Sequence, residues 1–507
     1  MDTDVIVIGA GPAGLMLATE LGLAGVPTVL LEALPTPSSQ SKGGGLQPRT
    51  CEVLELRGLL APVLEHALPR EPVGGHFAAL PVELDCRPWH TRHPYPVSVP
   101  QAAVQAVLAE VAGRRGVAVR SGHRVTAVHQ DADGVVVTAC TGDGGGELRA
   151  TARYAVACDG AHSTVRRLLD APFPGEPGTR TSTVADLRLT PGSAPTPARD
   201  GHMSSLVHTG GGYWTMLSRA DGGRHRLVYG TLDPTAGPAR DAPVTPSEVA
   251  DVLRAVHGPA RLGELFETSR FTDATRQLAS YRHGRVLFAG DAAHVHPPLG
   301  GQGLNLGIHD AMNLGWKLAA TVSGTAPNGL LDSYHDERHP VGAGVLAHTR
   351  AQRVLAERRP TPDVVALRDL VTELLRLPDT NAHLAGLMSG LGLRYPMPGQ
   401  PEGPLVGARM PDLSLSATGR GGRVSDLLWA GRPVLLDLRD DPGLADLPAL
   451  PGVARVTAKT AEELAAGAVL IRPDGYVCWA APPGPLTEAD LALLHAAAAR
   501  WCARPRP

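Results

Sequence analysis

The sequence predicts an α/β protein of Rossmann type that is interrupted by an antiparallel sheet and followed by a separate α/β unit. Residues 5–31 have the pattern strand, glycine turn, helix, strand. Short β patterns dominate from about 172 to 285. A new α/β pattern begins after a Pro/Gly-rich linker at 395–404. The 507 residues are enough for several hydrophobic cores.

The first unit begins with an apolar strand at Val5–Ile8 and a glycine-rich turn at Gly9–Gly14. A helix over Leu15–Leu23 and a second strand over Thr28–Leu31 follow. These lengths are typical of a βαβ unit, whose parallel strands are buried on both faces. Residues 35–50 are rich in Pro, Ser and Gly, and we expect a loop there.

The unit continues with a helix over residues 102–112. Strands then alternate from Val117 to Val137, with a hairpin turn at Asp131–Gly134. A buried strand at Tyr154–Ala157 completes the first part of the Rossmann-type domain. We place this part at residues 1–171.

The middle of the chain, residues 172–285, has a different pattern of secondary structure, with short strands and turns. The β patterns Tyr213–Leu217 and Arg226–Tyr229 are joined by the turn Ala220–Gly223, which predicts a hairpin of an antiparallel sheet. Residues 286–394 return to strand, glycine loop and long helix. We therefore expect them to complete the Rossmann-type domain and to add a helical region.

The last unit covers residues 405–507. Strand patterns occur at Val434–Leu438, Val469–Ile471 and Gly475–Trp479, and an Ala-rich helix is predicted from Leu486.

Composition excludes several classes of function. The net charge is −3, which gives no electrostatic basis for nucleic acid or an anionic membrane as partner. No run of 18 apolar residues predicts a spanning helix, and the first residues lack the basic region of a secretory signal. The six cysteines contain no Cys-x-x-Cys motif, so we expect reduced cytoplasmic thiols and no metal site.

The glycine turn carries the first chemical signal. Gly9, Gly11 and Gly14 form a Gly-x-Gly-x-x-Gly motif between a strand and a helix. The glycines allow backbone to approach a pyrophosphate, and the helix N-terminus faces the negative charge. Glu32 ends the next strand, where a carboxylate accepts hydrogen bonds from ribose hydroxyls. This context predicts dinucleotide binding, and the carboxylate favours FAD or NAD over NADP.

Two further motifs follow strands. Asp159 and Gly160 come directly after the strand that ends at Ala157. Asp291 follows the apolar segment Val286–Ala289 and leads into a glycine-rich helix start. An aspartate at a strand end can bind a ribityl hydroxyl, and a helix N-terminus can stabilise an anionic flavin ring.

These motifs resemble those of the class A FAD-dependent aromatic monooxygenases, the para-hydroxybenzoate hydroxylase superfamily. The similarity is densest from Tyr281 to Pro340, through Gly290–Pro298, Gly301–Asn305 and the Ser333–Pro340 stretch. Within the superfamily the chain is most similar to the actinobacterial polyketide hydroxylases and rifampicin monooxygenase. The resemblance implies a Rossmann-type FAD-binding domain, an inserted antiparallel-sheet substrate domain and a thioredoxin-like C-terminal domain without Cys-x-x-Cys.

The resemblance also implies the residues that bind FAD non-covalently. Gln101 matches a ribityl contact, Val125 a backbone contact near the adenine, and Arg49 an arginine of the mobile-flavin loop, which we take as the catalytic candidate. Relatives usually have arginine where this chain has Lys42, which keeps the charge but not the bidentate fork. The expected cofactor-binding set is Gly9, Gly11, Pro12, Ala13, Gly14, Glu32, Ala33, Lys42, Gln101, Val125, Asp159, Gly160, Asp291, Pro298, Gly301, Gly303, Leu304 and Asn305.

Such an enzyme reduces FAD with NADPH or NADH and transfers one atom of O2 to an aromatic substrate through a C4a-hydroperoxyflavin. Since only one Gly-x-Gly-x-x-Gly joins a strand to a helix, the nicotinamide must bind transiently. His294 and His296 lie in the flavin motif and are interpreted as loop residues, not metal ligands. The resemblance allows a monomer or a homodimer.

The substrate remains open at this point. The expected reaction is ring hydroxylation of a polycyclic polyketide. Baeyer–Villiger oxygenation of a polyketide and antibiotic-inactivating hydroxylation are the alternatives. A flavin-dependent halogenase would need a Trp-x-Trp-x-Ile-Pro stretch, which the sequence lacks. A flavin-dependent reductase and a non-enzymatic FAD scaffold are the other classes. The candidate substrate residues are Leu46, Trp214, Met216 and Tyr229.

Overall fold

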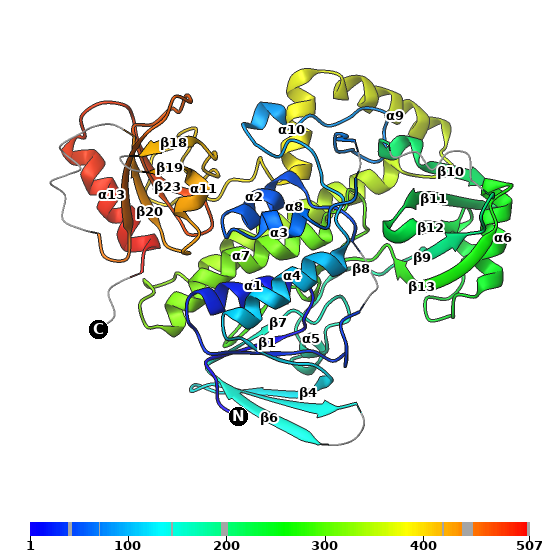
Figure 1. Ribbon diagram of the computed structural model, residues 1–507, viewed down its shortest axis with the longest axis horizontal. Helices are drawn as coiled ribbons and strands as arrows, with labels where there is room; N and C mark the ends of the chain where they lie inside the picture. The colour runs from blue at the N-terminus through cyan, green and yellow to red at the C-terminus, as the bar shows by residue number, and fades with distance from the viewer. Residues whose placement is uncertain are drawn as a thin grey trace.

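Three α/β units lie in a row in the structure, as Figure 1 shows. The sheet that packs against α6 (Pro246–His257) forms one end, the Rossmann-type unit lies in the centre, and the C-terminal sheet with α13 (Glu488–Trp501) forms the other end. The predicted fold class is therefore confirmed. The computed structural model describes residues 1–38, 43–69, 71–142, 146–193, 201–417, 420–438 and 450–503.

The central sheet is parallel except at one edge. Its strand order places the strand at Tyr154–Ala157, which leads into the second motif, between the strands that lead into the first and third motifs. The predicted strands at Val5–Ile8, Thr28–Leu31 and Tyr154–Ala157 all form. All three are fully buried, as expected of apolar strands covered on both faces. The order is β15 (Arg282–His283), β16 (Val286–Phe288), β7 (Tyr154–Ala157), β1 (Val5–Ile8), β2 (Thr28–Leu31) and β3 (Ala118–Arg120).

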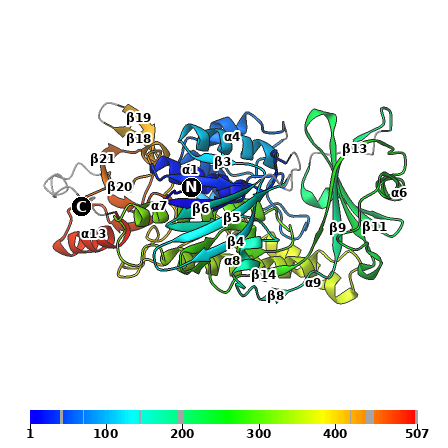
Figure 2. The same cartoon turned by 90° about the horizontal axis from the view of Figure 1, so that it is seen from below.

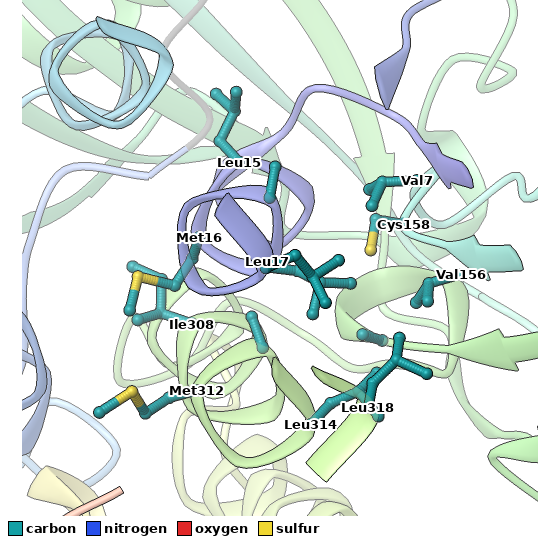
Figure 3. Packing of buried hydrophobic residues seen from close by; sticks show 14 of the residues in the cluster. Val7, Leu15, Met16, Leu17, Val156, Cys158, Ile308, Met312, Leu314 and Leu318 are labelled. Carbon is teal, nitrogen blue, oxygen red and sulfur yellow. The ribbon is translucent and has the colours of Figure 1, made fainter. Parts of the chain in front are cut away.

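Two helices that begin at glycine-rich segments pack closely against each other beside this sheet. α1 (Pro12–Leu23) begins at the glycine turn, and α7 (Gly303–Val322) begins at the glycine-rich loop of the third motif. A Cβ on Gly307 would lie 3.2 Å from the Cβ of Ala13, so glycine at this position allows the helices to meet. Figure 3 shows the apolar side chains packed around the two helices, including Leu15, Met16 and Leu17 of α1 and Ile308, Met312, Leu314 and Leu318 of α7.

The segment 35–50 is not entirely the expected loop. α2 (Pro48–Glu55) begins inside it, with Pro48 at the first helical position. Proline suits this position because its missing N–H would have no intrahelical partner there. The prediction of a loop was wrong from Pro48 onward because the abundance of Pro, Ser and Gly hid the helix start.

The middle sheet is antiparallel and carries α6 on one face, as Figure 2 shows at the right of the view. The predicted hairpin forms between β11 and β12. Register alternates side chains between the face against α6 and the opposite face, which we call the open face of the middle sheet. The strand order is β10 (Val207–Gly210), β11 (Tyr213–Arg219), β12 (His225–Thr231), β9 (Thr181–Leu189) and β13 (Leu262–Thr272).

The C-terminal sheet is mixed and packs against α13. Its helix begins two residues later than expected, because Thr487 caps it by accepting from the N–H of Asp490. The strand order is β19 (Arg420–Arg423), β18 (Ser414–Ala417), β21 (Ala454–Lys459), β20 (Val434–Asp437), β22 (Ala468–Ile471) and β23 (Val477–Ala481). The main core includes Val434, Leu436, Val469 and Ile471 of this sheet, and α11 (Val424–Leu427) contacts α2, so the core continues across the junction.

The remaining elements complete the central unit and its helical cap. Two small sheets have the orders β4 (His123–Gln130), β5 (Val135–Thr141), β6 (Glu147–Ala152) and β17 (His294–Val295), β14 (Thr275–Gln277), β8 (Gly175–Glu176). The other helices are α3 (Leu60–Leu64), α4 (Gln101–Arg114), α5 (Thr164–Leu168), α8 (Ser333–Leu355), α9 (Pro362–Leu375), α10 (Pro378–Ser389) and α11 (Val424–Leu427).

Candidate functional site

The glycine turn forms an open cradle at the start of α1. Gly9 has φ +104° and passes so close to Cys158 that a Cβ would lie 2.5 Å from its carbonyl oxygen. A Cβ on Gly11, in contrast, would meet nothing within 4 Å. Because Gly11 offers no side-chain cap, the first N–H groups of α1 stay available on this open side. This cradle fits a pyrophosphate.

Glu32 lies directly beside the cradle. Its Oε2 accepts from the N–H of Ala10 at 2.7 Å, and its Oε1 accepts from the N–H of Leu34 at 2.8 Å. The carboxylate is half-buried, and each oxygen can accept a further hydrogen bond. The side chain therefore joins the turn to the end of β2 and leaves acceptor capacity for ribose hydroxyls. Ala33 follows it.

We expect Glu32→Ala to weaken FAD binding about tenfold or more. Hydrogen bonds to a charged group contribute about 1.5–3 kcal/mol, and the substitution removes those to the ribose. Titration of the apoprotein with FAD, followed by flavin fluorescence, measures the dissociation constant. Glu65→Ala, at an exposed position, is the control. An unchanged dissociation constant for Glu32→Ala would remove the carboxylate from the ribose site.

Gln101 connects the cradle to residues 43–47, which we call the flavin loop because the resemblance assigns a mobile flavin to it. Its Oε1 accepts from the N–H of Gly43 at 3.0 Å, and its Nε2 donates to Gln105 at 3.1 Å. Gln105 in turn donates to the carbonyl oxygen of Ala10 at 3.0 Å. The sequence reasoning missed Gln105, although its spacing of four residues from Gln101 on one helix face was a usable signal. Lys42 lies outside the described residues.

Asp159 has one oxygen engaged and one without a partner. Its Oδ2 accepts from the N–H groups of Thr164 at 2.7 Å and Val165 at 3.1 Å. Its Oδ1 is buried and has no hydrogen-bond partner in the part of the chain that the structure describes. Burial raises the pKa of this carboxyl group. A buried acceptor without a donor is costly, which indicates that a bound group completes the site beside Gly160.

The third motif presents Asp291 and the N-terminus of α7 together. Asp291 is exposed and makes no hydrogen bond to the described residues. A Cβ on Gly303, the first residue of α7, would lie 3.8 Å from its Oδ1. Gln302 provides no side-chain cap, so the N–H groups of Gly303, Leu304 and Asn305 lack intrahelical acceptors. This end of the helix suits an electron-rich ring.

Asn305 holds the flavin-loop segment against this helix end. Its Oδ1 accepts from the N–H of Gln47 at 2.8 Å, and its Nδ2 donates to the carbonyl oxygen of Gly301 at 2.8 Å. A Cβ on Gly43 would lie 3.3 Å from Leu304. The structure therefore brings residues 43–47 beside the start of α7. Pro298 is exposed on the same loop as Gly301.

A buried ion network supports the third motif from behind. Asp310 accepts from the N–H of Gly290 at 3.1 Å, from His294 at 2.7 Å and from Arg338 at 2.7 Å. Burial alone would raise the pKa of Asp310, but Arg338 and His294 lower it to about 2. The carboxylate therefore stays ionised and fixes the turn that carries Asp291. His294 has this structural role, in agreement with its interpretation as a loop residue.

The prediction of a catalytic role for Arg49 is corrected. The side chain is 2% exposed, because it lies at the junction with the C-terminal sheet. It donates to Glu52 at 2.9 Å and to the carbonyl oxygen of Asp474 at 3.0 Å, and it stacks on Tyr476. These partners are structural, so Arg49 joins two units of the protein and does not face the cradle.

The open face of the middle sheet carries Trp214 and Met216 but not Tyr229. Tyr229 pairs with Thr215 across the hairpin, so both side chains point toward α6. The hydroxyl of Tyr229 donates to Glu248 at 2.7 Å, and the ring is 3% exposed. The prediction of Tyr229 as a substrate residue is therefore corrected.

Two more candidates were placed by resemblance or proximity alone. Leu46 is 1% exposed and packs in the main core, so protein atoms already cover the side chain and its assignment to the substrate site is corrected. Val125 lies in β4 at a β-bulge, where its pairing with β5 is irregular. Its adenine contact stays a prediction.

The sequence reasoning also missed a residue that links the middle sheet to the flavin loop. Arg226 lies on the open face and donates to both oxygens of Asp186 at 2.8 Å. Its remaining nitrogen, Nη1, would lie 3.8 Å from a Cβ on Gly44. The open face therefore lies opposite residues 43–47. No local pattern predicts this contact, because it joins segments about 180 residues apart in the chain.

The thiols of the C-terminal unit lack the properties of redox cysteines. Burial raises the pKa of Cys478 far above its ordinary value and that of Cys502 to about 12. Thiolates are therefore scarce at neutral pH, which supports a structural role. Among the described residues no group of three or more His, Cys, Asp or Glu side chains could hold a metal ion. No helix in the described ranges is long and apolar enough to cross a membrane.

Comparisons with known proteins agree with this geometry. The family model described as "FAD binding domain" matches residues 2–349, and "Aromatic-ring hydroxylase, C-terminal" matches 403–505. The chain is 44% identical over 498 residues to 12-dehydrotetracycline 5-monooxygenase/anhydrotetracycline 6-monooxygenase of Streptomyces rimosus, covering 95% of this chain and 96% of the relative. It is 42% identical over 490 residues to rifampicin monooxygenase of Streptomyces venezuelae, covering 94% and 95%. The solved structure of OxyS anhydrotetracycline hydroxylase from Streptomyces rimosus superposes with a TM-score of 0.86 at 42% identity, covering 99% of each chain.

Proposed function

The chain belongs to the FAD-dependent aromatic-ring hydroxylases, and we propose that it hydroxylates a ring of a polycyclic aromatic polyketide. The protein is an FAD-dependent aromatic monooxygenase, and NAD(P)H is the typical reductant of its family. Two relatives are named for their action on anhydrotetracycline and rifampicin, which supports a large polyketide-derived substrate.

One observation carries the proposal beyond the family. The open face of the middle sheet presents Trp214 and Met216 toward solvent-accessible space, while Arg226 on the same face approaches Gly44 of the flavin loop. A flat indole and a thioether on one side, with the cofactor site on the other, suit a flat aromatic ligand. We therefore assign Trp214 and Met216 to the substrate site.

FAD, when bound, supplies the redox and oxygen chemistry of the reaction. In the balanced reaction, the aromatic C–H, O2, NAD(P)H and one proton give the C–OH product, water and NAD(P)⁺. The chain supplies binding and electrostatics. The first N–H groups of α7 stabilise negative charge on the adjacent ring, and the Asp310–Arg338 pair holds that helix end in place.

We assign FAD binding to the residues that form the cradle and its surroundings. The cradle takes the pyrophosphate, Glu32 the ribose, and Asp159 and Asp291 the ribityl side. The unpaired Oδ1 of Asp159 and the open space beside Gly11 support this assignment. The set consists of Gly9, Gly11, Pro12, Ala13, Gly14, Glu32, Ala33, Gln101, Val125, Asp159, Gly160, Asp291, Pro298, Gly301, Gly303, Leu304 and Asn305.

Anhydrotetracycline is the first probe for the proposed reaction. We expect it, or another fused-ring polyketide phenol, to stimulate NADPH oxidation and O2 consumption by the holoenzyme, with one oxygen atom added to the product. A simple one-ring phenol is the matched control and should stimulate less. Product NMR is required because ring hydroxylation and Baeyer–Villiger insertion add the same mass. Stimulation by the one-ring phenol alone would overturn the polycyclic assignment, and an inserted ester oxygen would replace hydroxylation by insertion.

A further inference from the structure

Arg358 follows shortly after α8, and its side chain points into the space beside the open face of the middle sheet. Its guanidinium makes no hydrogen bond or ion pair within the described ranges, although the side chain is half-buried. The neighbouring carboxylate of Glu357 is already engaged, because its Oε2 accepts from Arg180 at 2.6 Å and its Oε1 from two backbone N–H groups at 2.8 and 3.2 Å. The donors of this guanidinium are therefore available to a bound anion.

The guanidinium lies over Trp214 of the open face, 5.2 Å from the ring centroid. The indole lies flat across Gly230, where a Cβ would be 2.7 Å from Nε1, so glycine on the neighbouring strand makes this orientation possible. The indole N–H makes no hydrogen bond to the residues that the structure describes. Two donors without acceptors, one of them cationic, therefore lie side by side.

A second arginine lies beside these donors, together with the engaged carboxylate of Glu357. Arg368 lies close enough to affect Arg358, but its guanidinium donates to the carbonyl oxygens of Leu355 and Glu357 and not to a carboxylate. Burial lowers the pKa of Arg358, and Arg368 lowers it further. The two arginines favour an anion at the same place.

The distance between Trp214 and the flavin loop is similar to the length of a fused-ring ligand. Arg226, whose Nη1 faces Gly44, pairs with Ser218 of β11. Trp214 lies four residues from Ser218 on the same strand and the same face. At about 3.3 Å per residue, the separation along the strand is about 13 Å. Met216 lies between them. A linear fused-ring system of three or four rings spans a comparable length.

We propose that Arg358 and the indole N–H of Trp214 bind an anionic oxygen, a carboxylate or an ionised enol or phenol, at the end of the substrate remote from the flavin. This assignment rests on the proposed function and adds the chemistry of one substrate end to it. The substrate then lies along β11, with its reacting ring toward residues 43–47. Arg358 determines which fused-ring compounds bind and in which direction they enter.

The test uses anthracene-2-carboxylate and anthracene-2-carboxamide, which match in shape and differ in charge. Equilibrium dialysis with the FAD-loaded enzyme gives both dissociation constants. We expect the wild type to bind the carboxylate at least about tenfold more tightly than the carboxamide, as for a charge-assisted hydrogen bond. Arg358→Gln should abolish this preference, and Arg358→Lys should retain part of it, because the charge remains but the fork is lost. Arg359→Gln, at the exposed neighbouring position, is the matched control and should keep it.

The outcomes separate this inference from the proposed function. Equal binding of the two compounds by the wild type, or an unchanged preference in Arg358→Gln, overturns the anion site and leaves the fused-ring substrate intact. Failure of the wild type to bind either compound contradicts both. A loss of preference in Arg358→Gln at unchanged carboxamide affinity supports the site, because a merely structural role for Arg358 would weaken both ligands.

Discussion

Replacing Arg472 by methionine is expected to lower the melting temperature of the protein on the order of 10 °C. Arg472 is fully buried and donates to both carboxylate oxygens of Glu337, at 2.5 and 2.8 Å, and to Asp474 at 2.5 and 3.0 Å. Breaking a buried ion pair costs about 3–5 kcal/mol, because the remaining charge is left without a partner. A loss of this size corresponds to a shift of several degrees or more in a large protein.

The substitution acts at the junction between two units. Glu337 belongs to α8 of the central unit and also accepts from Lys317 of α7 at 2.8 Å, whereas Arg472 and Asp474 follow β22 of the C-terminal sheet. The C-terminal unit therefore holds α7 and α8 together from outside. We expect Arg472→Met to release FAD at a lower temperature than the wild type.

Thermal melting followed by circular dichroism and by flavin fluorescence measures both effects. Arg254→Met breaks an exposed ion pair with Asp251 on α6 and serves as the control. Exposed pairs contribute about 0–1 kcal/mol, so the control should melt within about two degrees of the wild type. If the melting temperature of Arg472→Met equals that of the control, the buried network does not stabilise the junction.

Acid pH provides a second measurement of the same network. Burial would raise the pKa of Glu337, but Arg472 and Lys317 lower it from 4.5 to about 2 in the folded state. An acid with a lowered folded pKa contributes stability that is present above pH 4.5 and lost as the pH falls toward 2. We expect Arg472→Met to show a smaller loss of stability across this interval than the wild type, since part of the contribution is already gone.

Local signals explain why the sequence predicted the Rossmann-type elements well. Gly9, Gly11 and Gly14 need no distant partner to form their turn, and the strand at Val5–Ile8 is buried along its whole length. The same holds for the hairpin at Ala220–Gly223, whose turn residues determine its position. These predictions depended on residues that are close together in the chain.

Side-chain direction could not be predicted in the same way. Trp214 and Tyr229 both occur in predicted strands, but which face each side chain takes depends on the register between them. The structure pairs Tyr229 with Thr215, so the two aromatic residues point to opposite faces. A shift of one residue would reverse this result.

Contacts between segments that are distant in the chain could not be predicted from the sequence either. Arg49 was assigned by resemblance, but its partner Asp474 lies 425 residues away in the chain. Arg226 and Arg358 carry no local motif, and both gain significance only where the middle sheet meets the central unit. In each case the tertiary structure, not the local pattern, determines the environment of the arginine.

A true substrate is expected to raise the rate of flavin reduction by NADPH by orders of magnitude. Without substrate, rapid reduction would consume NADPH and release peroxide, so control of reduction prevents waste. The flavin loop suits such control, because Gly43–Gly45 has no side chains, lies beside Leu304 and is fastened by Gln101 and Asn305. Anaerobic stopped-flow mixing at fixed NADPH measures the rate with and without substrate. Equal rates would show that this enzyme reduces its flavin unconditionally.

The variant Gly44→Val is expected to lower the reduction rate at least tenfold while leaving FAD bound. A Cβ at this position already lies 3.8 Å from Nη1 of Arg226, so the two additional methyl groups of valine press on the Arg226–Asp186 pair and restrict the loop. The cradle at Gly11 is unchanged, which is why FAD affinity should stay within about twofold. Gly113→Ala is the control, because it lies in the last turn of α4 with nothing within 4 Å of an added Cβ, and it should reduce at the wild-type rate. Loss of FAD from Gly44→Val would show that the loop holds the cofactor, whereas normal reduction would show that the glycines are not needed for access of the nicotinamide.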